Sequence, residues 1–404
     1  MRNVVFAAPF PLATTMRFAR AAARLNDVRL LGLVQEAPPG DDAKIFADTV
    51  RVSDGLDARQ LTDGARLLQA RHGKLHRVLG ILEPLQVQLA QVRAELGVQG
   101  TDPQTADLFR NKARMKDELR RHGLPCAKHS LIRTWADAEE FVAAVGFPMV
   151  LKPPAGMAAK STWRIGNVDE LRSALHALHA SPENPALAEE FLRAREHSFE
   201  TITIGGEVRF VSISRYYPTP LEVVETPWIQ WVIVLPRVID TQEFADVREL
   251  GVRAVKALGL ETGFTHMEWF RRDDGSLAIG EIAARPPGAH IVLANSYAHD
   301  ADMYRAWARA VVDEAFDGPY ERRYSVGVAY LRGAGQGRVK AVRGVDEANA
   351  KVGRLVVDSQ LPRVGAPKSD SYEGDGYIIV RDIDVEVVKA AMTTIIETIQ
   401  VDYA

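Results

Sequence analysis

Cysteine is nearly absent from this sequence of 404 residues, since Cys126 is the only one. A single cysteine excludes a disulfide framework and a thiolate metal site within one chain. No motif for a reactive thiol surrounds Cys126. We therefore expect it to be a small core residue and not a nucleophile.

Long apolar runs and a marked net charge are also missing. No run approaches the ~18 apolar residues that a membrane span needs. The apolar start, Val4–Leu12, is short and contains two prolines, unlike a signal peptide. The formal net charge of −3 gives no reason to expect nucleic acid or an anionic membrane as a partner. We expect a soluble, cytoplasmic protein that binds neither.

The beginning of the chain predicts an α/β unit with a parallel sheet. Strand signals at Val4–Ala8 and Val28–Val34 flank a helical pattern at Thr15–Leu25, which is typical of a βαβ unit. The GxGxxG turn is missing, so a dinucleotide site in this unit is not expected. Gly100–Pro103 marks a domain boundary.

After this boundary the pattern changes to α+β. Thr105–Gly123 has helical periodicity and ends at a glycine that fits a C-terminal cap. Thr134 and Asn167 each begin a segment that resembles a capping box, with the strand Phe147–Lys152 between them. The remaining chain is rich in strand signals and closes on a helix. We therefore expect three domains, at residues 1–104, 105–185 and 186–404, the last with a closing segment at 320–404.

Two lysines occupy unusual places. Lys112 lies within the apolar stripe of the helix expected at Thr105–Gly123, and Lys152 ends an apolar strand. A snorkelling side chain would explain Lys112, and an ordinary exposed turn would explain the loop after Lys152. Alternatively, a cation at a strand end followed by a loop of small residues can hold a polyphosphate. Lys160 and Ser161 lie in that loop, which has only one glycine.

Two glutamates are expected to face each other across a hairpin. Asp274-Gly275 is a strong signal for a two-residue turn between the strands Phe264–Phe270 and Leu277–Ala283. The register that such a turn imposes places Glu268 directly opposite Glu281. Opposed like charges with Cβ atoms about 5 Å apart are destabilising, and a Mg²⁺ ion held with substrate phosphates would remove the repulsion. The alternatives are solvated glutamates on an exposed edge, or one protonated acid.

Arg285 follows Glu281 at an even spacing and is expected on the same face of the strand. A guanidinium beside a metal-bound phosphate can stabilise charge that develops during group transfer. A structural ion pair with a nearby acid is the alternative.

Taken in order, these segments resemble the ATP-grasp superfamily and, within it, the branch of amino-acid (dipeptide) ligases and other carboxylate–amine ligases. The resemblance runs from about Thr105 to Gly288, with a weaker match in the closing segment. It is carried by Asn111–Lys116, Gly123–Pro125 with Phe147–Pro153, Ala188–Leu192 with Arg195–Glu200, His266–Phe270, and Glu281–Pro286. Each segment alone is a weak signal, but the order and gaps of all of them are specific.

The resemblance implies an ATP-grasp fold, in which an N-terminal parallel α/β domain precedes two α+β subdomains that bind the nucleotide between them. Residues 105–185 would form the lid subdomain. ATP would be bound through its phosphates by Lys112 and Lys152, with Lys160 and Ser161 in the phosphate loop. Glu268 and Glu281 would bind Mg²⁺, or alternatively Mn²⁺, and Arg285 and Lys152 would be catalytic. The adenine and ribose would be bound by Glu189, Glu190, Phe191, Leu192 and Glu196.

The sequence departs from the family in two places. Many members carry Asn where this chain has Ala283, which implies one fewer protein ligand for a metal ion. The phosphate loop also has fewer glycines than usual, so its closure would depend on Lys160 and Ser161. Neither departure removes a carboxylate or a phosphate-binding lysine.

The activity that this resemblance implies is ATP-dependent formation of an amide or peptide bond through an acyl-phosphate, with release of ADP and phosphate. The alternatives are a purine-pathway or carboxyphosphate-forming ligase of the same superfamily, and a non-catalytic nucleotide-binding module. Small carboxylate and amine substrates are expected, one of them an amino acid, and family members are often homodimers. The expected substrate contacts are Arg215, Trp231, Gly288 and His290. The alternatives are a core or interface aromatic for Trp231 and a structural histidine for His290.

Overall fold

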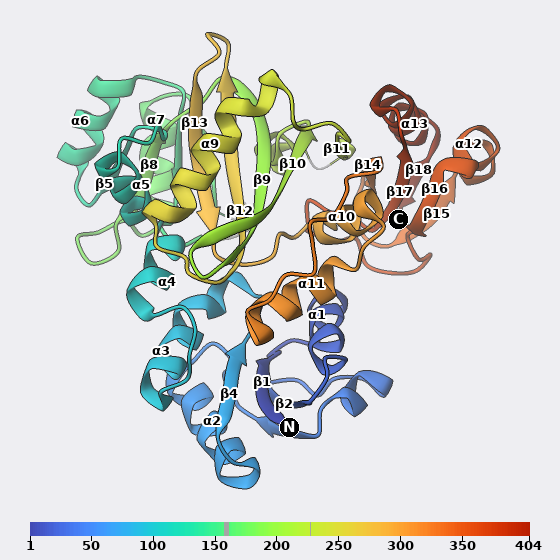
Figure 1. Cartoon of the computed structure of the whole chain (residues 1–404). Coiled ribbons are helices and arrows are strands. Elements are labelled where there is room, and N and C mark those ends of the chain that lie inside the picture. The colour runs from blue at the N-terminus through green and yellow to red at the C-terminus, as the bar shows by residue number, and fades with distance from the viewer. Residues whose placement is uncertain (157–160, 227) are drawn as a thin grey trace.

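The computed structural model of the chain describes residues 1–156, 161–226 and 228–404. The N-terminal unit is the parallel α/β unit that the sequence predicts, and it lies at the bottom of Figure 1. Its strands β1 (Arg2–Ala7), β2 (Val28–Val34), β3 (Asp48–Arg51) and β4 (Leu75–Leu79) form one sheet in the order β3-β2-β1-β4. Every pair in it is parallel.

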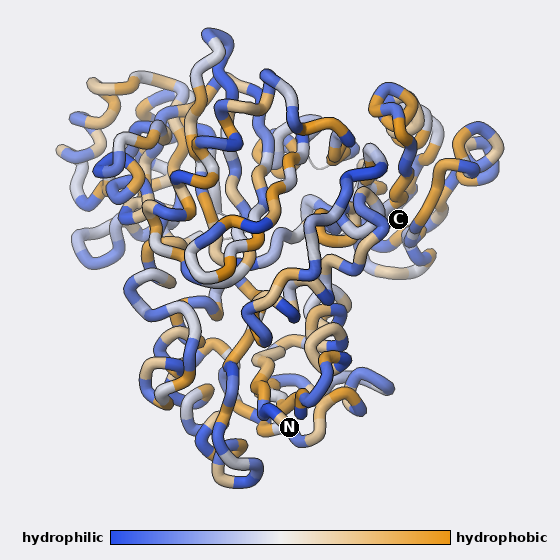
Figure 2. The backbone as a smooth tube through the Cα atoms, viewed as in Figure 1, coloured by the Kyte–Doolittle hydropathy of each residue, from blue (hydrophilic) through white to orange (hydrophobic). Residues whose placement is uncertain are grey.

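Helices cover both faces of this sheet. Successive residues of a strand point to opposite faces, so β1 contributes side chains to a core on each side. Val4 and Phe6 pack with α1 (Ala13–Ala23), whereas Val5 and Ala7 pack with α2 (Ala58–His72) and α3 (Gln86–Leu96). Burial on both faces requires apolar residues at successive positions, as at Val4–Ala7 in β1. Figure 2 shows hydrophobic stretches within this unit. Two short 3₁₀ turns, η1 (Gly40–Ile45) and η2 (Glu83–Leu85), complete the unit.

The single helix expected at Thr105–Gly123 is wrong, because the chain breaks at Asn111. It forms α4 (Pro103–Arg110) and then α5 (Lys112–Arg121). Asn111 has an extended backbone, and its side chain accepts hydrogen bonds from the backbone N–H groups of Ala113 and Arg114. This N-cap makes Lys112 the first residue of α5 and not a residue in the middle of a helix.

A small antiparallel sheet follows, at the upper left of Figure 1. Its order is β5-β8-β6-β7, with bounds His129–Ile132, Ala186–Glu190, Met149–Lys152 and Trp163–Ile165. Two helices pack on it, α6 (Trp135–Val145) and α7 (Val168–Ala177). The caps expected from the sequence are present, since Thr134 takes part in a full capping box and the Asn167 side chain accepts from the Glu170 N–H. Strand β8 lies beyond residue 185, so the sheet continues past the expected boundary.

The rest of the chain is built on an eight-stranded antiparallel sheet with the order β13-β12-β9-β10-β11-β14-β17-β16. In chain order its strands are β9 (Ala194–Ile204), β10 (Glu207–Tyr217), β11 (Trp231–Leu235), β12 (Gly263–Arg272), β13 (Leu277–Ala283), β14 (Ser325–Leu331), β16 (Val356–Gln360) and β17 (Gly376–Asp382). A two-stranded sheet pairs β15 (Val339–Arg343) with β18 (Gln400–Tyr403). The strands of the C-terminal segment therefore extend the same sheet that carries the predicted metal hairpin.

The remaining helices surround this sheet. Their bounds are α8 (Pro220–Glu225), α9 (Gln242–Ala257), α10 (Ile291–His299), α11 (Met303–Ala308), the π-helical turn η3 (Arg309–Asp313), α12 (Val345–Val352), η4 (Gly353–Leu355) and α13 (Val385–Thr398). Helix α11 packs against α1 and ties the large sheet's unit to the N-terminal unit. Among the described helices, none has both the length and the apolar character required to cross a membrane.

Candidate active site

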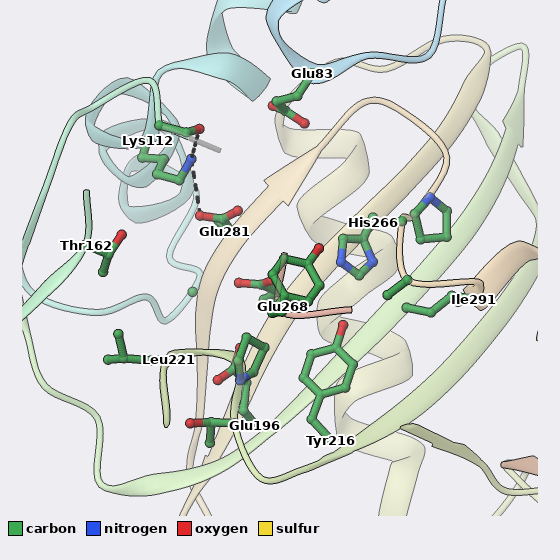
Figure 3. A pocket seen from close by; sticks show the side chains of 18 of the residues that line it. Glu83, Lys112, Thr162, Glu196, Tyr216, Leu221, His266, Glu268, Glu281 and Ile291 are labelled. Carbon is green, nitrogen blue, oxygen red and sulfur yellow. Dashed lines mark hydrogen bonds and ion pairs between the residues drawn. The ribbon is translucent and has the colours of Figure 1, made fainter. Parts of the chain in front are cut away.

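A cavity of about 550 Å³ opens where the N-terminal unit, the small sheet and the large sheet meet. Glu83 reaches it from the N-terminal unit, Lys152 and Glu189 from the small sheet, and Glu268 and Glu281 from the large sheet. Figure 3 shows Lys112 and Glu281 pointing toward one another, with Glu268 and Glu196 farther along the same cavity.

Glu268 on β12 lies directly opposite Glu281 on β13, as the sequence predicts. The predicted two-residue turn is nevertheless wrong. Arg271 pairs with Leu277, so the loop has one more residue than expected, and Gly275 in it has a left-handed backbone with φ 84°. A β-bulge at Gly280 then shifts the register by one residue and restores the opposed glutamates.

The two opposed carboxylates have different electrostatic surroundings. Burial and the charge of Glu281 raise the pKa of Glu268 to about 6. The neighbouring Glu196 also has a raised pKa, because it is buried beside both of these acids. Burial acts in the same direction on Glu281, but Lys112 and Lys152 outweigh it and lower the pKa of Glu281 to about 2. Glu196, Glu268 and Glu281 thus form an acidic cluster whose mutual repulsion a bound cation would reduce.

Lys112 and Lys152 approach this carboxylate cluster from two different elements. The Lys112 Nζ lies 3.3 Å from Glu281 Oε2 and donates to the carbonyl oxygen of Gly156 at 3.2 Å. The Lys152 Nζ lies 2.9 Å from Glu189 Oε2 and 3.9 Å from Glu281 Oε2. Only 9% of the Lys112 side chain is exposed, which contradicts the alternative of a snorkelling surface lysine.

Lys116 is a third lysine at this site, and sequence reasoning did not single it out. Its side chain is fully buried, its Nζ lies 2.8 Å from Glu189 Oε1, and it donates to the carbonyl oxygen of Gly280. Burial lowers the pKa of Lys116, while the charge of Glu189 opposes that effect. The signal was available, because Lys116 follows Lys112 by four residues and so shares its helix face.

The donor set fits a divalent cation that completes its coordination with phosphate oxygens. Within the described parts of the chain, no group of three or more His, Cys, Asp or Glu side chains is arranged to hold a metal ion alone. Two opposed carboxylates, one of which has no lysine partner among the described residues, match the way that Mg²⁺ is commonly bound together with a nucleotide.

Arg285 lines the same cavity but already has a partner there. Its Nε donates to Glu83 Oε2 at 2.5 Å, and its Nη1 donates to the Pro286 carbonyl oxygen at 2.9 Å. The structural ion pair that the sequence left open is therefore present. It joins the loop after β13 to the N-terminal unit.

Comparison with known families agrees with this geometry. Residues 117–293 match the model of the ATP-grasp domain, and this segment carries Lys152, Glu268 and Glu281. The chain contains an ATP-grasp domain. Lys112 lies just before the matched residues, on the first turn of α5.

The chain is similar to ligases of known name over part of their length. The L-arginine-specific L-amino acid ligase of Bacillus subtilis is 27% identical over 251 residues, which cover 61% of this chain and 60% of that protein. The chain thus spans less than two-thirds of that relative.

Solved structures share the fold of the whole chain. An L-amino acid ligase from Bacillus licheniformis superposes with a TM-score of 0.82 at 20% identity, covering 100% of this chain and 99% of that one. A carboxyaminoimidazole ribonucleotide synthase from Aspergillus clavatus, complexed with ATP, gives 0.73 at 19% identity and covers 98% of both chains. At these identities the likeness shows that the chain shares their overall fold.

Most of the expected nucleotide contacts line the cavity of the ATP-grasp domain. Glu189, Phe191, Leu192 and Glu196 do so directly. Glu190 also lines it, but its Oε1 accepts from the Lys128 N–H at 2.8 Å and from Arg272 at 2.9 Å.

Of the two expected phosphate-loop contacts, Lys160 and Ser161, the structure describes only Ser161. Ser161 is exposed and is not among the lining residues, whereas its neighbour Thr162 is. Lys160 lies outside the residues that the structure describes.

The expected substrate contacts divide into two groups. Trp231, Gly288 and His290 line the cavity. Arg215 does not, because it lies next to the cavity residue Tyr216 on β10 and so faces the other side of the sheet. Its Nη2 donates to Glu243 at 2.5 Å, so Arg215 is engaged on that side of the sheet and not at the cavity wall.

Proposed function

We propose that this protein is an ATP-dependent carboxylate–amine ligase that forms an amide or peptide bond through an acyl-phosphate and releases ADP and phosphate. The observation that carries the proposal is the convergence of Lys112 and Lys152 on the opposed Glu268 and Glu281 within one cavity. A carboxylate is a poor electrophile, and such a cluster suits its activation by phosphoryl transfer.

The roles follow from charge and position. Lys112 and Lys152 would exchange their present carboxylate partners for phosphate oxygens, which carry more negative charge. Glu268 and Glu281 would hold Mg²⁺, which when bound supplies neutralisation of charge on the transferred phosphoryl group. Arg285, held by Glu83, would stabilise the acyl-phosphate and the oxyanion that forms when the amine attacks.

Water must be kept from the acyl-phosphate during the reaction. We propose that the small sheet with α6 and α7 acts as the lid of the site. It carries Lys152 and Glu189 into the cavity. The ion pairs of these residues with Lys116 and Glu281 would change as nucleotide binds.

An amino acid is proposed as one substrate. The similarity to an L-amino acid ligase supports this choice. Trp231 and His290 supply an aromatic and a polar group at the wall of the cavity.

The proposal is tested by measuring ADP release from Mg²⁺-ATP with pairwise mixtures of amino acids and small carboxylic acids. We expect release that requires one particular pair and disappears in Glu281→Ala. The matched control is Glu243→Ala, since Glu243 is 57% exposed and does not line the cavity. Incorporation of labelled bicarbonate would transfer the assignment to a carboxyphosphate-forming ligase. ATP binding without ADP release across the panel would favour a non-catalytic module.

A further inference from the structure

A loop of the C-terminal segment supplies two residues to the cavity that none of the roles above uses. It connects β16 to β17 and places Tyr372 and Glu373 at the cavity wall, beside Gly288 and Ala289. The Glu373 Oε1 accepts a hydrogen bond from the Ala289 backbone N–H at 3.2 Å. This contact fixes the carboxylate at the side of the loop that follows Arg285.

Glu373 has no cationic partner among the described residues. Its only ion-pair contact is with His290 Nδ1, 3.7 Å from Oε2. Burial, with the nearby charge of Arg17, lowers the pKa of His290 to about 4, so this imidazole is neutral at neutral pH. Lys112, Lys152 and Arg285 are engaged with other carboxylates of the cavity, namely Glu281, Glu189 and Glu83.

The Glu373 side chain is 29% exposed at the cavity wall, so its carboxylate is partly shielded from water and open to a ligand in the cavity. Burial raises the pKa of Glu373, which reports the cost of this shielding. Removing a carboxylate from water without a partner is unfavourable, and a cation that forms a hydrogen bond to it reverses much of that penalty.

The surroundings of Glu373 suit an organic cation in particular. Tyr372 packs edge-on against Trp231 with ring centroids 5.0 Å apart, and Trp231 stacks on Tyr330 at 5.0 Å. Aromatic rings attract guanidinium and ammonium groups and also accept the alkyl chain that carries them. A Cβ atom at Gly288 would lie 3.9 Å from Glu373 Oε1, so glycine there leaves the approach to the carboxylate open.

We propose that Glu373 binds a cationic nitrogen group of an amino-acid substrate, with Tyr372 and Trp231 lining the path to it. This inference rests on the proposed ligase function and adds a determinant of substrate choice to it. The cation is either a side-chain guanidinium or ammonium group, or the α-ammonium group. These two sources give different outcomes in one experiment.

The test is calorimetric binding to the full chain in the presence of Mg²⁺ and a non-hydrolysable ATP analogue. The probes are L-arginine with its neutral isostere L-citrulline, L-lysine with L-norleucine, and L-alanine. For a side-chain cation, we expect the charged member of each pair to bind at least about tenfold more tightly, the effect of a charge-assisted hydrogen bond. In Glu373→Gln this preference should fall to near one, while the Gln oxygen can still accept from Ala289.

For an α-ammonium group, Glu373→Gln should weaken all five probes alike, L-alanine included. The matched control is Glu347→Gln, an exposed glutamate of the same C-terminal segment, which should bind like the wild type. The proposal is overturned if Glu373→Gln binds every probe as the wild type does, or if no probe binds the wild type.

ADP release by the same samples separates this inference from the ligase proposal. If ADP release is unaffected by Glu373→Gln, the ligase proposal stands and the proposed role of Glu373 is refuted. If binding depends on Glu373 but no ADP is released, the cation site stands and the ligase proposal is refuted.

Discussion

Glu189 bridges the fully buried Lys116 and the largely buried Lys152, with its Oε1 2.8 Å from Lys116 Nζ and its Oε2 2.9 Å from Lys152 Nζ. Lys116 comes from α5, Lys152 from β6 and Glu189 from β8. Because Lys116 also donates to the Gly280 carbonyl oxygen, this arrangement links the small sheet to the bulge that sets Glu268 opposite Glu281. The lysines proposed to bind phosphate and the glutamates proposed to bind metal are therefore mechanically connected.

Removal of the Lys116 charge should destabilise the protein. In Lys116→Met the side-chain volume is kept, but Glu189 loses one of its two partners. We expect the free energy of unfolding to fall by about 3 kcal/mol, the lower end for breaking a buried pair, because Lys152 remains. Denaturant unfolding measures it. The control Lys351→Met removes an exposed pair with Glu347 and should change stability by less than about 0.5 kcal/mol. An equally small loss in Lys116→Met would contradict the bridging role.

Binding of Mg²⁺ should weaken at acidic pH. The pKa of Glu268 is raised to about 6 by burial and by Glu281, and a carboxylate must be deprotonated to bind a metal ion. The affinity is therefore complete above this pKa and is lost as the pH falls through it. We expect the dissociation constant to rise about tenfold per pH unit below pH 6, since one proton is displaced per ion bound. Calorimetric titration of Mg²⁺ with ADP present checks this, and an affinity independent of pH would refute it.

Two arginines that the sequence assigned to the site should differ in importance. Arg215→Ala should keep ADP release within about twofold of the wild type, because Arg215 lies outside the cavity and its pair with Glu243 is partly exposed. Arg285→Lys should reduce kcat by about 10²-fold or more, since an ammonium group lacks the planar fork that stabilises developing charge. Steady-state assays compare the two variants. Equal losses would place Arg215 back in the substrate site.

The bulge at Gly280 should be intolerant of a side chain. A Cβ atom there would lie 2.7 Å from Phe270 Cε2 and 3.3 Å from the Glu268 carbonyl oxygen. Gly280→Ala should therefore cost about 1–3 kcal/mol of stability and weaken Mg²⁺ binding by displacing Glu268. In the control Gly166→Ala, the nearest atom is Glu170 Oε2 at 3.4 Å, an ordinary contact. Wild-type Mg²⁺ affinity in Gly280→Ala would show that the register does not depend on this glycine.

Much of the fold was predictable because it depends on local patterns. The parallel N-terminal unit followed from apolar strands that alternate with a helix, and the cap at Thr134 followed from its own side chain. The break at Asn111 was missed because the apolar periodicity continues through it, whereas the N-cap depends on one side chain turning back on the backbone. The hairpin loop was misjudged by one residue, and the bulge at Gly280 compensated for that error.

The sequence by itself determined which chemical groups this protein has for its site. Local spacing sets a lysine at the start of a helix, a lysine at the end of a strand, and two glutamates on a hairpin. Only the tertiary structure decided which of them meet. Burial of Lys116, exclusion of Arg215, and the partners of Arg285 and Glu373 depend on contacts between residues far apart in the chain. Such contacts arise when separate units pack together, and one-dimensional spacing does not encode their geometry.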